Sequence, residues 1–315
     1  YIFRSNFMGK LTVVGSIAYD TVETPFGKLE RRFGGSAIYF SVSASLFTPV
    51  YMIGVVGDDF DLNFLKRLEK RRIDYQGVEI KKGEKTFFWK GRYEGDMNEA
   101  ISECTELNAF QNFKPILKDI HKDTTYLFLA NIDPQLQVDV LNQIEKPKIV
   151  ICDTMNYWIK SKKDVLVELF KVVDGVILNE AELYMFLEES VQKKSINYLE
   201  AMEKLLNLGP KVVIVKKGCY GVDAMSREFF INLPAFLTKE VKDPTGAGDS
   251  FAGGIMGYLA SKDLGLDKKS MARALAYGTV TASYNIEDFS IFKLYNITKK
   301  EIENRFRMLK QRIAL

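Results

Sequence analysis

The sequence contains a single histidine, His121, and only three cysteines, Cys104, Cys152 and Cys219. Mechanisms with a histidine base, and metal sites built from several histidines, have almost no residues to work with, so a general base here is expected to be a carboxylate. His121 falls in a polar, loop-like stretch. The cysteines form no CxxC pair, which is typical of a reducing cytosol and predicts a cytoplasmic protein. Cys152 and Cys219 lie in or beside apolar segments and are expected in the core.

The sequence also lacks an excess of charge of either sign. It has 44 lysines and arginines against 41 aspartates and glutamates, a net charge of +3, so no nucleic acid or membrane partner is expected. No apolar run approaches the length of a membrane span, residues 1–10 show no signal-peptide core, and a P-loop motif is absent. Because the chain lacks an initial Met and Met8 precedes the first apolar segment, we expect residues 1–7 to be a tag remnant or an extension.

Short apolar segments alternate with amphipathic segments along most of the chain. The apolar segments have the length of strands, and they lie at 11–15, 51–56, 126–130, 148–152, 175–178 and 211–215. The amphipathic segments have helical spacing, at 36–47, 61–71, 134–144, 163–172, 180–188, 250–261, 268–285 and 298–313. This alternation predicts an α/β fold with a mostly parallel sheet covered by helices on both faces. Two polar-aromatic segments, 18–33 and 85–107, contain turn residues and are expected to form hairpins outside that sheet.

The most informative segment is Asp-Pro-Thr-Gly-Ala-Gly-Asp-Ser-Phe-Ala-Gly-Gly at 243–254. Its turn of small residues, Gly246, Ala247 and Gly248, precedes a segment with helical spacing, so free backbone N–H groups converge at the positive end of a helix dipole. Asp249 follows this expected anion site, where a carboxylate is suited to take a proton from a hydroxyl beside a phosphate. An ordinary helix cap is the alternative. The motif favours phosphoryl transfer to an alcohol.

The same twelve residues resemble the signature of the ribokinase-like (PfkB) carbohydrate and nucleoside kinases, and the resemblance extends from about Leu11 to the last helix. It implies a single ribokinase-like, doubly wound α/β domain over residues 8–315, with 18–33 and 85–107 inserted as a small β-sheet lid. It also implies an ATP- and Mg²⁺-dependent kinase that phosphorylates a sugar, nucleoside or polyol, with Asp249 as base and the 246–248 backbone as anion hole. A stimulating monovalent cation and a homodimer formed through the lid are further features that the resemblance allows.

A catalytically quiet protein that senses a sugar or a nucleotide on the same fold is the alternative, and the intact Asp249 counts against it. A nicotinamide-binding protein is disfavoured because Phe251 occupies the third glycine position of the dinucleotide fingerprint.

Further residues match the family around its nucleotide. Asn179 and Glu182 match an Asn-x-x-Glu motif associated with Mg²⁺ and phosphate, and the resemblance makes Glu182 the metal ligand; a capping box is the alternative. The glycine-containing segment after the 211–215 strand resembles the part of the family that flanks the nucleotide. The residues expected near the nucleotide are Lys216 or Lys217, Gly218, Gly221, Thr245, Ala282, Ser283 and Asn285. The alternative is a solvated side chain for the lysines, a helix cap for Thr245 and core packing for Ala282.

The resemblance places the acceptor at the end of the first strand. Asp20 would bind substrate hydroxyls, and Gly34 and Gly35 would let the substrate approach a helix start; ordinary turn residues are the alternatives. In ribokinase the motif continues Gly-Gly-Lys-Gly-Ala-Asn, whereas here Ser36 replaces the lysine and Tyr39 the asparagine. These two changes argue against ribose as the acceptor.

The remaining substrate candidates follow other strands or lie in the lid. They are Asn131, the cluster Asp153, Asn156 and Trp158, and the lid residues Arg92, Tyr93 and Asn98. Strand-end turn residues, or the packed face of the lid, are the alternatives, and the packed face is favoured for Phe87 and Phe88. Because ligands bind at the carboxyl ends of parallel strands, one cleft is expected to gather these groups.

Overall fold

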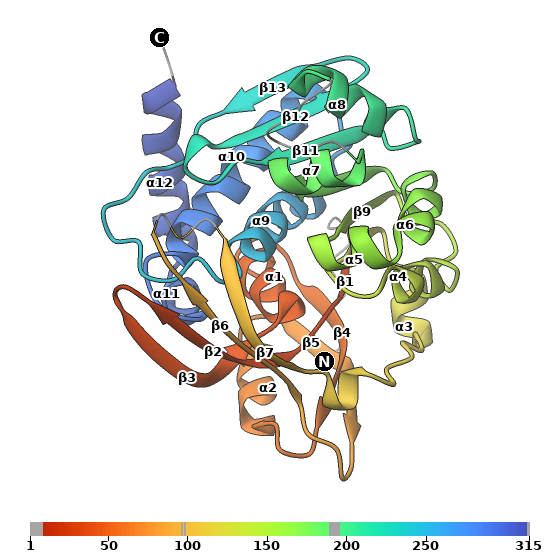
Figure 1. The fold of residues 1–315 in the computed structure, drawn as a ribbon, viewed down its shortest axis with the longest axis vertical. Coiled ribbons are helices and arrows are strands. Elements are labelled where there is room, and N and C mark those ends of the chain that lie inside the picture. Colours follow the sequence, from red (N-terminus) through yellow and green to blue (C-terminus); the bar gives the residue numbers. More distant parts are fainter. Residues whose placement is uncertain (1–8, 96, 98, 189–195, 314–315) are drawn as a thin grey trace.

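The computed structural model describes residues 9–95, 97, 99–188 and 196–313 (Figure 1). The expected domain ends at residues 8 and 315, and Asn98, lie outside these residues. Nine strands in the described part form one sheet in the order β13-β12-β11-β10-β9-β8-β1-β4-β5. Their bounds are β1 Leu11–Val14, β4 Val50–Gly57, β5 Ile73–Lys81, β8 Tyr126–Leu129, β9 Ile149–Asp153, β10 Gly175–Asn179, β11 Val212–Lys216, β12 Val222–Ser226 and β13 Phe230–Leu233.

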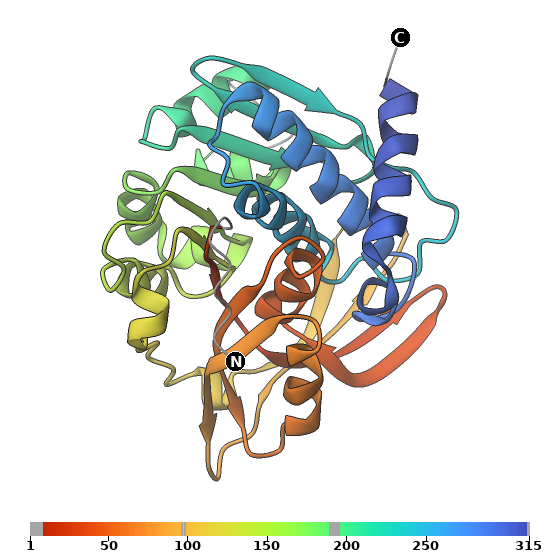
Figure 2. The same cartoon turned by 180° about the vertical axis from the view of Figure 1, so that it is seen from behind.

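Helices cover both faces of this sheet, as Figures 1 and 2 show from opposite sides. The helices are α1 Ser36–Ala44, α2 Leu62–Glu69, α3 Asp119–Lys122, α4 Pro134–Leu141, α5 Asn156–Ser161, α6 Lys163–Phe170, α7 Glu180–Phe186, α8 Tyr198–Leu206, α9 Ala247–Ser261, α10 Lys268–Asn285, α11 Phe292–Asn296 and α12 Lys299–Ile313, with 3₁₀ turns η1 Asn108–Phe110 and η2 Gly218–Tyr220. Successive residues of a strand point to opposite faces, so Phe128 joins the core beneath α1, α9 and α10, whereas Leu127 joins the core beneath α4, α6, α7 and α8.

Within the described nine-stranded sheet, the pairings from β5 to β11 are parallel, and the pairs β11–β12 and β12–β13 are antiparallel. The predicted α/β fold with a mostly parallel, doubly covered sheet is therefore confirmed. The two expected hairpins are also present: β2 Ala18–Thr24 pairs with β3 Gly27–Gly34, and β6 Phe87–Tyr93 pairs with β7 Ala100–Glu106. The parallel contact between β2 and β6 joins them into a separate small sheet, in the order β3-β2-β6-β7. Its closure over a substrate and its use in a dimer stay predictions.

Two sequence expectations about packing are wrong. His121 is fully buried in the short helix α3, whereas the sequence around it has the polar character of a loop. Its neighbours along the chain are mostly exposed, so the sequence pattern does not reveal the one inward-facing position. Cys219 is exposed in η2, since the chain has already left strand β11, whereas Cys152 is buried as expected. No described helix has the length and apolar character that crossing a membrane would need.

Candidate functional site

The start of α9 is shaped by Gly246. This residue has φ 73°, a left-handed conformation, and a Cβ at this position would overlap the ring of Tyr39, so both the backbone and the packing require glycine. One expected anion-hole donor is already engaged, because the Ala247 N–H donates to the carbonyl of Pro244 at 3.1 Å. The N–H of Gly248 lies in the first turn, where intrahelical partners are missing.

Asp249 lies in this first turn, at the positive end of the helix. Burial raises its pKa to about 7, and the nearby carboxylate of Asp153 acts in the same direction, while Lys216 opposes them. A carboxyl group with a pKa near neutrality can both accept and release a proton at physiological pH. Asp249 therefore has the electrostatic character of a general base.

Lys216 is the cation of this site. It ends β11, and its Nζ atom lies 3.3 Å from Oδ2 of Asp153, which ends β9. A Cβ on Gly248 would be 3.1 Å from the same Nζ, which places the ammonium group beside the first turn of α9. Burial alone lowers the pKa of Lys216, but Asp153, Glu182 and Asp249 outweigh it and raise the pKa. Lys216 is therefore charged and adjacent to the expected anion site.

The neighbouring lysine has a different environment. Nζ of Lys217 pairs with the buried Asp223 of β12 at 3.0 Å and lies over the ring of Tyr198. Lys217 follows the last residue of β11 and turns toward β12, so only Lys216 of the two expected candidates reaches the site.

The Asn-x-x-Glu motif forms a capping box at the start of α7. The Asn179 N–H donates to Oε2 of Glu182 at 2.7 Å, and the Glu182 N–H donates to Oδ1 of Asn179 at 2.8 Å. Burial raises the pKa of Glu182 to about 7, Lys216 lowers it and Asp153 raises it. The capping alternative is thus present, and it does not exclude a second role, because the box uses only one carboxylate oxygen.

Mg²⁺ fits this set of residues only as a partner of phosphate. No group of three metal-ligating side chains occurs among the described residues. Glu182 and Asp153 can supply one or two carboxylates near Lys216, and Mg²⁺ is commonly held by that number together with substrate phosphates and water.

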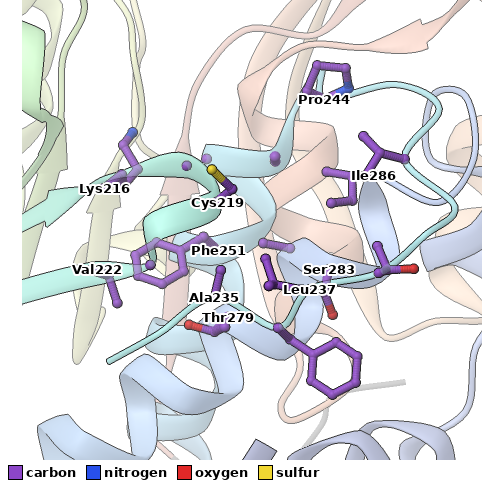
Figure 3. A pocket seen from close by; sticks show the side chains of 18 of the residues that line it. Lys216, Cys219, Val222, Ala235, Leu237, Pro244, Phe251, Thr279, Ser283 and Ile286 are labelled. Atoms are coloured by element: carbon purple, nitrogen blue, oxygen red, sulfur yellow. The ribbon is translucent and has the colours of Figure 1, made fainter. Parts of the chain in front are cut away.

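A cavity of about 460 Å³ opens beside these groups, between the β11–β13 edge of the sheet and helices α9 and α10 (Figure 3). Five of the expected nucleotide residues line it: Asn179, Lys216, Gly218, Gly221 and Ser283. Ala282 also lines it. Gly221 has φ 97°, and a Cβ there would overlap the backbone of Leu233, so glycine is required where the chain turns past the cavity. The cavity has the place and the mixed lining expected of a nucleotide site.

Much of the cavity wall was not predicted from the sequence. The segment between β13 and α9 contributes Ala235, Phe236, Leu237, Thr238 and Val241. Phe251 of α9 and Thr279 of α10 also line the cavity, and Leu237, Phe251 and Thr279 are labelled in Figure 3. The apolar residues that precede the Asp243 motif could have indicated this part of the cavity wall, because apolar residues in a loop are normally covered by the protein or by a ligand.

Thr245 links the motif to the small sheet. Its N–H donates to Oδ1 of Asp243 at 2.9 Å, and its hydroxyl donates to the Tyr93 hydroxyl at 3.3 Å. Asn285, expected beside the nucleotide, instead donates from Nδ2 to the Thr245 carbonyl at 2.7 Å and accepts a hydrogen bond from the Ser250 hydroxyl at 3.1 Å. Asn285 therefore braces the motif and does not line the cavity.

Asp20, Gly34 and Gly35 lie together where β2, β3 and α1 meet. A Cβ on Gly34 would overlap the Asp20 carboxylate, and Gly35 has φ 92°, where a Cβ would overlap the Ser16 backbone. Both glycines thus permit close approach. Burial raises the pKa of Asp20 to about 8, and the carboxylates of Asp243 and Asp249 contribute, so Asp20 lies within electrostatic reach of the expected base.

The two residues that depart from ribokinase behave differently. The Ser36 N–H and hydroxyl bond with the Ser16 hydroxyl at 3.0 and 3.2 Å, so Ser36 fastens α1 to the loop after β1. Tyr39 is buried, its ring lies against Gly246, and its hydroxyl has no hydrogen-bond partner among the described residues. Tyr39 therefore reaches the site, whereas the polar groups of Ser36 are used within the fold.

The other substrate candidates divide in the same way. Arg92 forms ion pairs with Glu94 and Glu103 of the small sheet and is not brought to the other site residues. Phe87 stacks on Phe110, as the packed-face alternative requires. Asn131 follows β8 with its Oδ1 buried and unpaired among the described residues.

Asp153 contacts Lys216, but the other two residues of the expected cluster, Asn156 and Trp158, belong to α5. The Trp158 ring packs on Tyr157 and beneath Lys162.

Comparison with known proteins identifies relatives. A model of the pfkB family carbohydrate kinases matches residues 8–291. The cytidine kinase of Thermococcus kodakarensis is 29% identical over 265 residues, covering 81% of this chain and 90% of that protein. The ribokinase of Dictyostelium discoideum is 27% identical, covering 80% and 88%. The crystal structure of Methanocaldococcus jannaschii nucleoside kinase superimposes with a TM-score of 0.76 at 19% identity, covering 96% of this chain and 100% of that one, which shows the shared fold.

Proposed function

The chain belongs to the pfkB family of carbohydrate kinases, phosphotransferases that act on hydroxyl groups, and from this premise we propose that it transfers the γ-phosphoryl group of ATP to a hydroxyl of a sugar, nucleoside or polyol. The observation that carries the proposal is the position of Asp249. It lies at the N-terminus of α9, directly after Ala247 and Gly248, which line a cavity of nucleotide size; Lys216 stands beside the same turn, and the charge of Asp249 acts on the acceptor carboxyl group of Asp20.

In this proposal the nucleotide occupies the cavity, with its phosphates toward Lys216 and the first turn of α9. Asp249 accepts the proton of the acceptor hydroxyl as that oxygen attacks the γ-phosphorus, and the bond from the γ-phosphorus to the bridging oxygen breaks, so that ADP leaves. The Gly248 N–H, the helix dipole and Lys216 stabilise the negative charge on the transferred group. Mg²⁺ bound with ATP would add positive charge at the phosphates, near Glu182 and Asp153.

Nucleosides and sugars are the acceptors to examine first. The cytidine kinase and ribokinase relatives are named for a nucleoside and a sugar. The tyrosine at position 39 supports an acceptor other than ribose. The free cysteines support our proposal that the protein works in the cytoplasm.

The test is ADP release with Mg-ATP against a panel of nucleosides, sugars, sugar acids and inositols, with the Asp249→Asn protein as the matched blank. We expect one acceptor class to be phosphorylated and the variant to be about 10²–10⁴-fold slower while still binding ATP. Near-native turnover by the variant would contradict the assigned base. If the native protein binds ATP but releases no ADP with any compound of the panel, the alternative of a sensing protein would be favoured.

A further inference from the structure

The acceptor end of the cleft is built from acids. Asp20 is 6% exposed, and the absence of a side chain at Gly34 is what makes room for its carboxylate. Burial is the main cause that raises the pKa of Asp20, the carboxylates of Asp243 and Asp249 act in the same direction, and a backbone hydrogen bond from Gly35 acts against them. Asp243 is itself buried and accepts the N–H groups of Thr245 and Ser290. A molecule bound here would therefore be surrounded by carboxyl groups.

An unpaired phenol faces the same place. Tyr39 is 1% exposed, and its hydroxyl has no hydrogen-bond partner within the described residues. The ionisable groups that act most strongly on this hydroxyl are Asp20, Asp243 and Tyr93. Burying an unpaired hydroxyl is unfavourable. A ligand that carries hydroxyl groups would supply the missing partner.

Three basic side chains of the small sheet are committed elsewhere. Lys90 and Arg92 both pair with Glu103, at 2.8 and 3.0 Å. Arg31 pairs with Asp59 at 2.5 Å and stacks over an aromatic ring. These cations fasten the small sheet to itself and to the loop after β4, so these three do not pair with the acids of the acceptor end. Arg32, which stands opposite Asp20 in the β2–β3 register, is exposed to solvent.

The cation of the cleft lies at the other end. Lys216 contacts Asp153 and stands beside Gly248, where the phosphates of a nucleotide are proposed to bind. The charged lysine thus lies at the donor end, and titratable carboxyl groups lie at the acceptor end. An anionic group on the acceptor would meet like charge whenever Asp249 is ionised to act as base, and it would otherwise hold the neighbouring carboxyl groups protonated, so its binding is disfavoured in a buried site.

We propose, resting on the kinase function above, that this site selects electrically neutral polyhydroxy acceptors whose hydroxyls pair with Asp20 and Tyr39, and rejects acceptors that carry a carboxylate or a phosphate. The selection is a difference in affinity created by repulsion as well as by contacts. Neutral nucleosides, sugars and inositols belong to the accepted class. Sugar acids and sugar phosphates belong to the rejected class.

The test uses pairs of compounds that differ by one anionic group and keep a free primary or secondary hydroxyl. Suitable pairs are uridine and uridine 3′-phosphate, fructose and fructose 6-phosphate, glucose and glucuronate, and inositol and an inositol monophosphate. We expect the best acceptor to be neutral, with kcat/KM at least about 100-fold above that of its anionic partner. A best acceptor that is anionic would overturn the proposal.

A variant tests the part played by the phenol. Tyr39→Phe keeps the ring against Gly246 and removes only the unpaired hydroxyl. We expect the KM for the acceptor to rise about tenfold while the KM for ATP stays unchanged, a split that a general loss of stability would not give. Tyr126→Phe is the matched control, because it removes another phenol hydroxyl, bonded to the Leu264 carbonyl far from the cleft. Equal KM values in the Tyr39→Phe and native proteins would remove Tyr39 from the proposal.

Binding separates this proposal from the kinase function. The same pairs are titrated calorimetrically into the Asp249→Asn protein, with and without ATP. Neutral members that bind more tightly than their anionic partners support the selection even where the native protein turns over no acceptor, in which case only the kinase proposal fails. Equal binding of both members, or binding of neither, overturns the selection itself.

Discussion

Lys216 and Asp153 form an ion pair that spans the strand between them. Lys216 ends β11 and Asp153 ends β9, with β10 in the middle, and Nζ lies 3.3 Å from Oδ2. Glu182 follows the end of β10, so three neighbouring strands deliver one cation and two carboxylates to one point. Asp249 approaches the same point from α9. An incoming phosphate would therefore compete with Asp153 for the only cation of this cluster in the described chain.

Replacing Lys216 with methionine tests this competition. We expect the KM for ATP to rise at least tenfold, because the phosphates lose a charge-assisted contact. The pKa of Asp249 should also rise, since Lys216 lowers it. The measurement is steady-state kinetics across pH.

Lys217→Met is the matched control, because Lys217 pairs with Asp223 away from the cleft. We expect this control to lose stability but to keep the KM for ATP and the pH profile. If both variants raise the KM for ATP to the same degree, the assignment of Lys216 to the phosphates is wrong.

The pH dependence of transfer should report Asp249. Burial first, and Asp153 second, raise its pKa to about 7, and the base must be ionised to accept a proton. We therefore expect kcat/KM to be at its plateau above neutrality and to fall about tenfold per pH unit below it. Because Glu182 also has a pKa of about 7, Glu182→Gln is measured beside the native protein. A profile that stays flat from pH 6 to pH 8 would contradict the role of Asp249.

The sequence was sufficient for most of the fold because buried parallel strands are short and uniformly apolar. The helix predicted at 268–285 coincides with α10, and both hairpins of the small sheet were located. Strand β5 was missed because an edge strand is half exposed and its residues show no clear alternation, and β12 and β13 were missed as antiparallel additions at the opposite edge.

The candidate site was predictable only where a motif fixes the backbone. Gly246 and Asp249 follow from local sequence, whereas the choice between Lys216 and Lys217 depends on where β11 ends and on the pairing of Lys217 with Asp223 of β12. The bond between Ser36 and Ser16, and the ion pairs of Arg92, join segments distant along the chain or across a sheet. Such contacts depend on the assembled fold, which explains why these side chains turned away from the expected substrate.

Chemical modification of Cys219 should report nucleotide binding. This exposed cysteine lines the cavity, whereas Cys152 is buried and Cys104 is half-buried in β7. We expect iodoacetamide to label Cys219 first and ATP to slow that labelling at least tenfold, since a bound nucleotide would cover the thiol. Peptide mass spectrometry measures the labelled fraction, and Cys219→Ser is the control that should lose the protected signal. Equal labelling with and without saturating ATP would place the nucleotide elsewhere.

His121 should make the protein less stable in acid. It is fully buried, and both ring nitrogens lack a hydrogen-bond partner among the described residues. Burial lowers its pKa below the ordinary value of 6.5; Asp74 and Asp123 act to raise it, while Lys10 and Lys118 act to lower it further. The unfolded chain therefore binds the proton more readily than the folded protein does. The stabilising contribution is present above about pH 6.5 and is lost as the pH falls through the range where only the unfolded state is protonated.

Replacing His121 with leucine, a side chain of similar size, removes this contribution. Each pH unit in that range costs the native protein about 1.4 kcal/mol of unfolding free energy. Asp20, Glu182 and Asp249 have raised pKa values and act in the opposite direction, so the informative quantity is the difference between the two proteins. We expect urea unfolding at pH 7.5 and pH 5.5 to show a larger loss in the native protein than in the variant. Parallel losses would mean that the buried imidazole finds a partner when it becomes protonated.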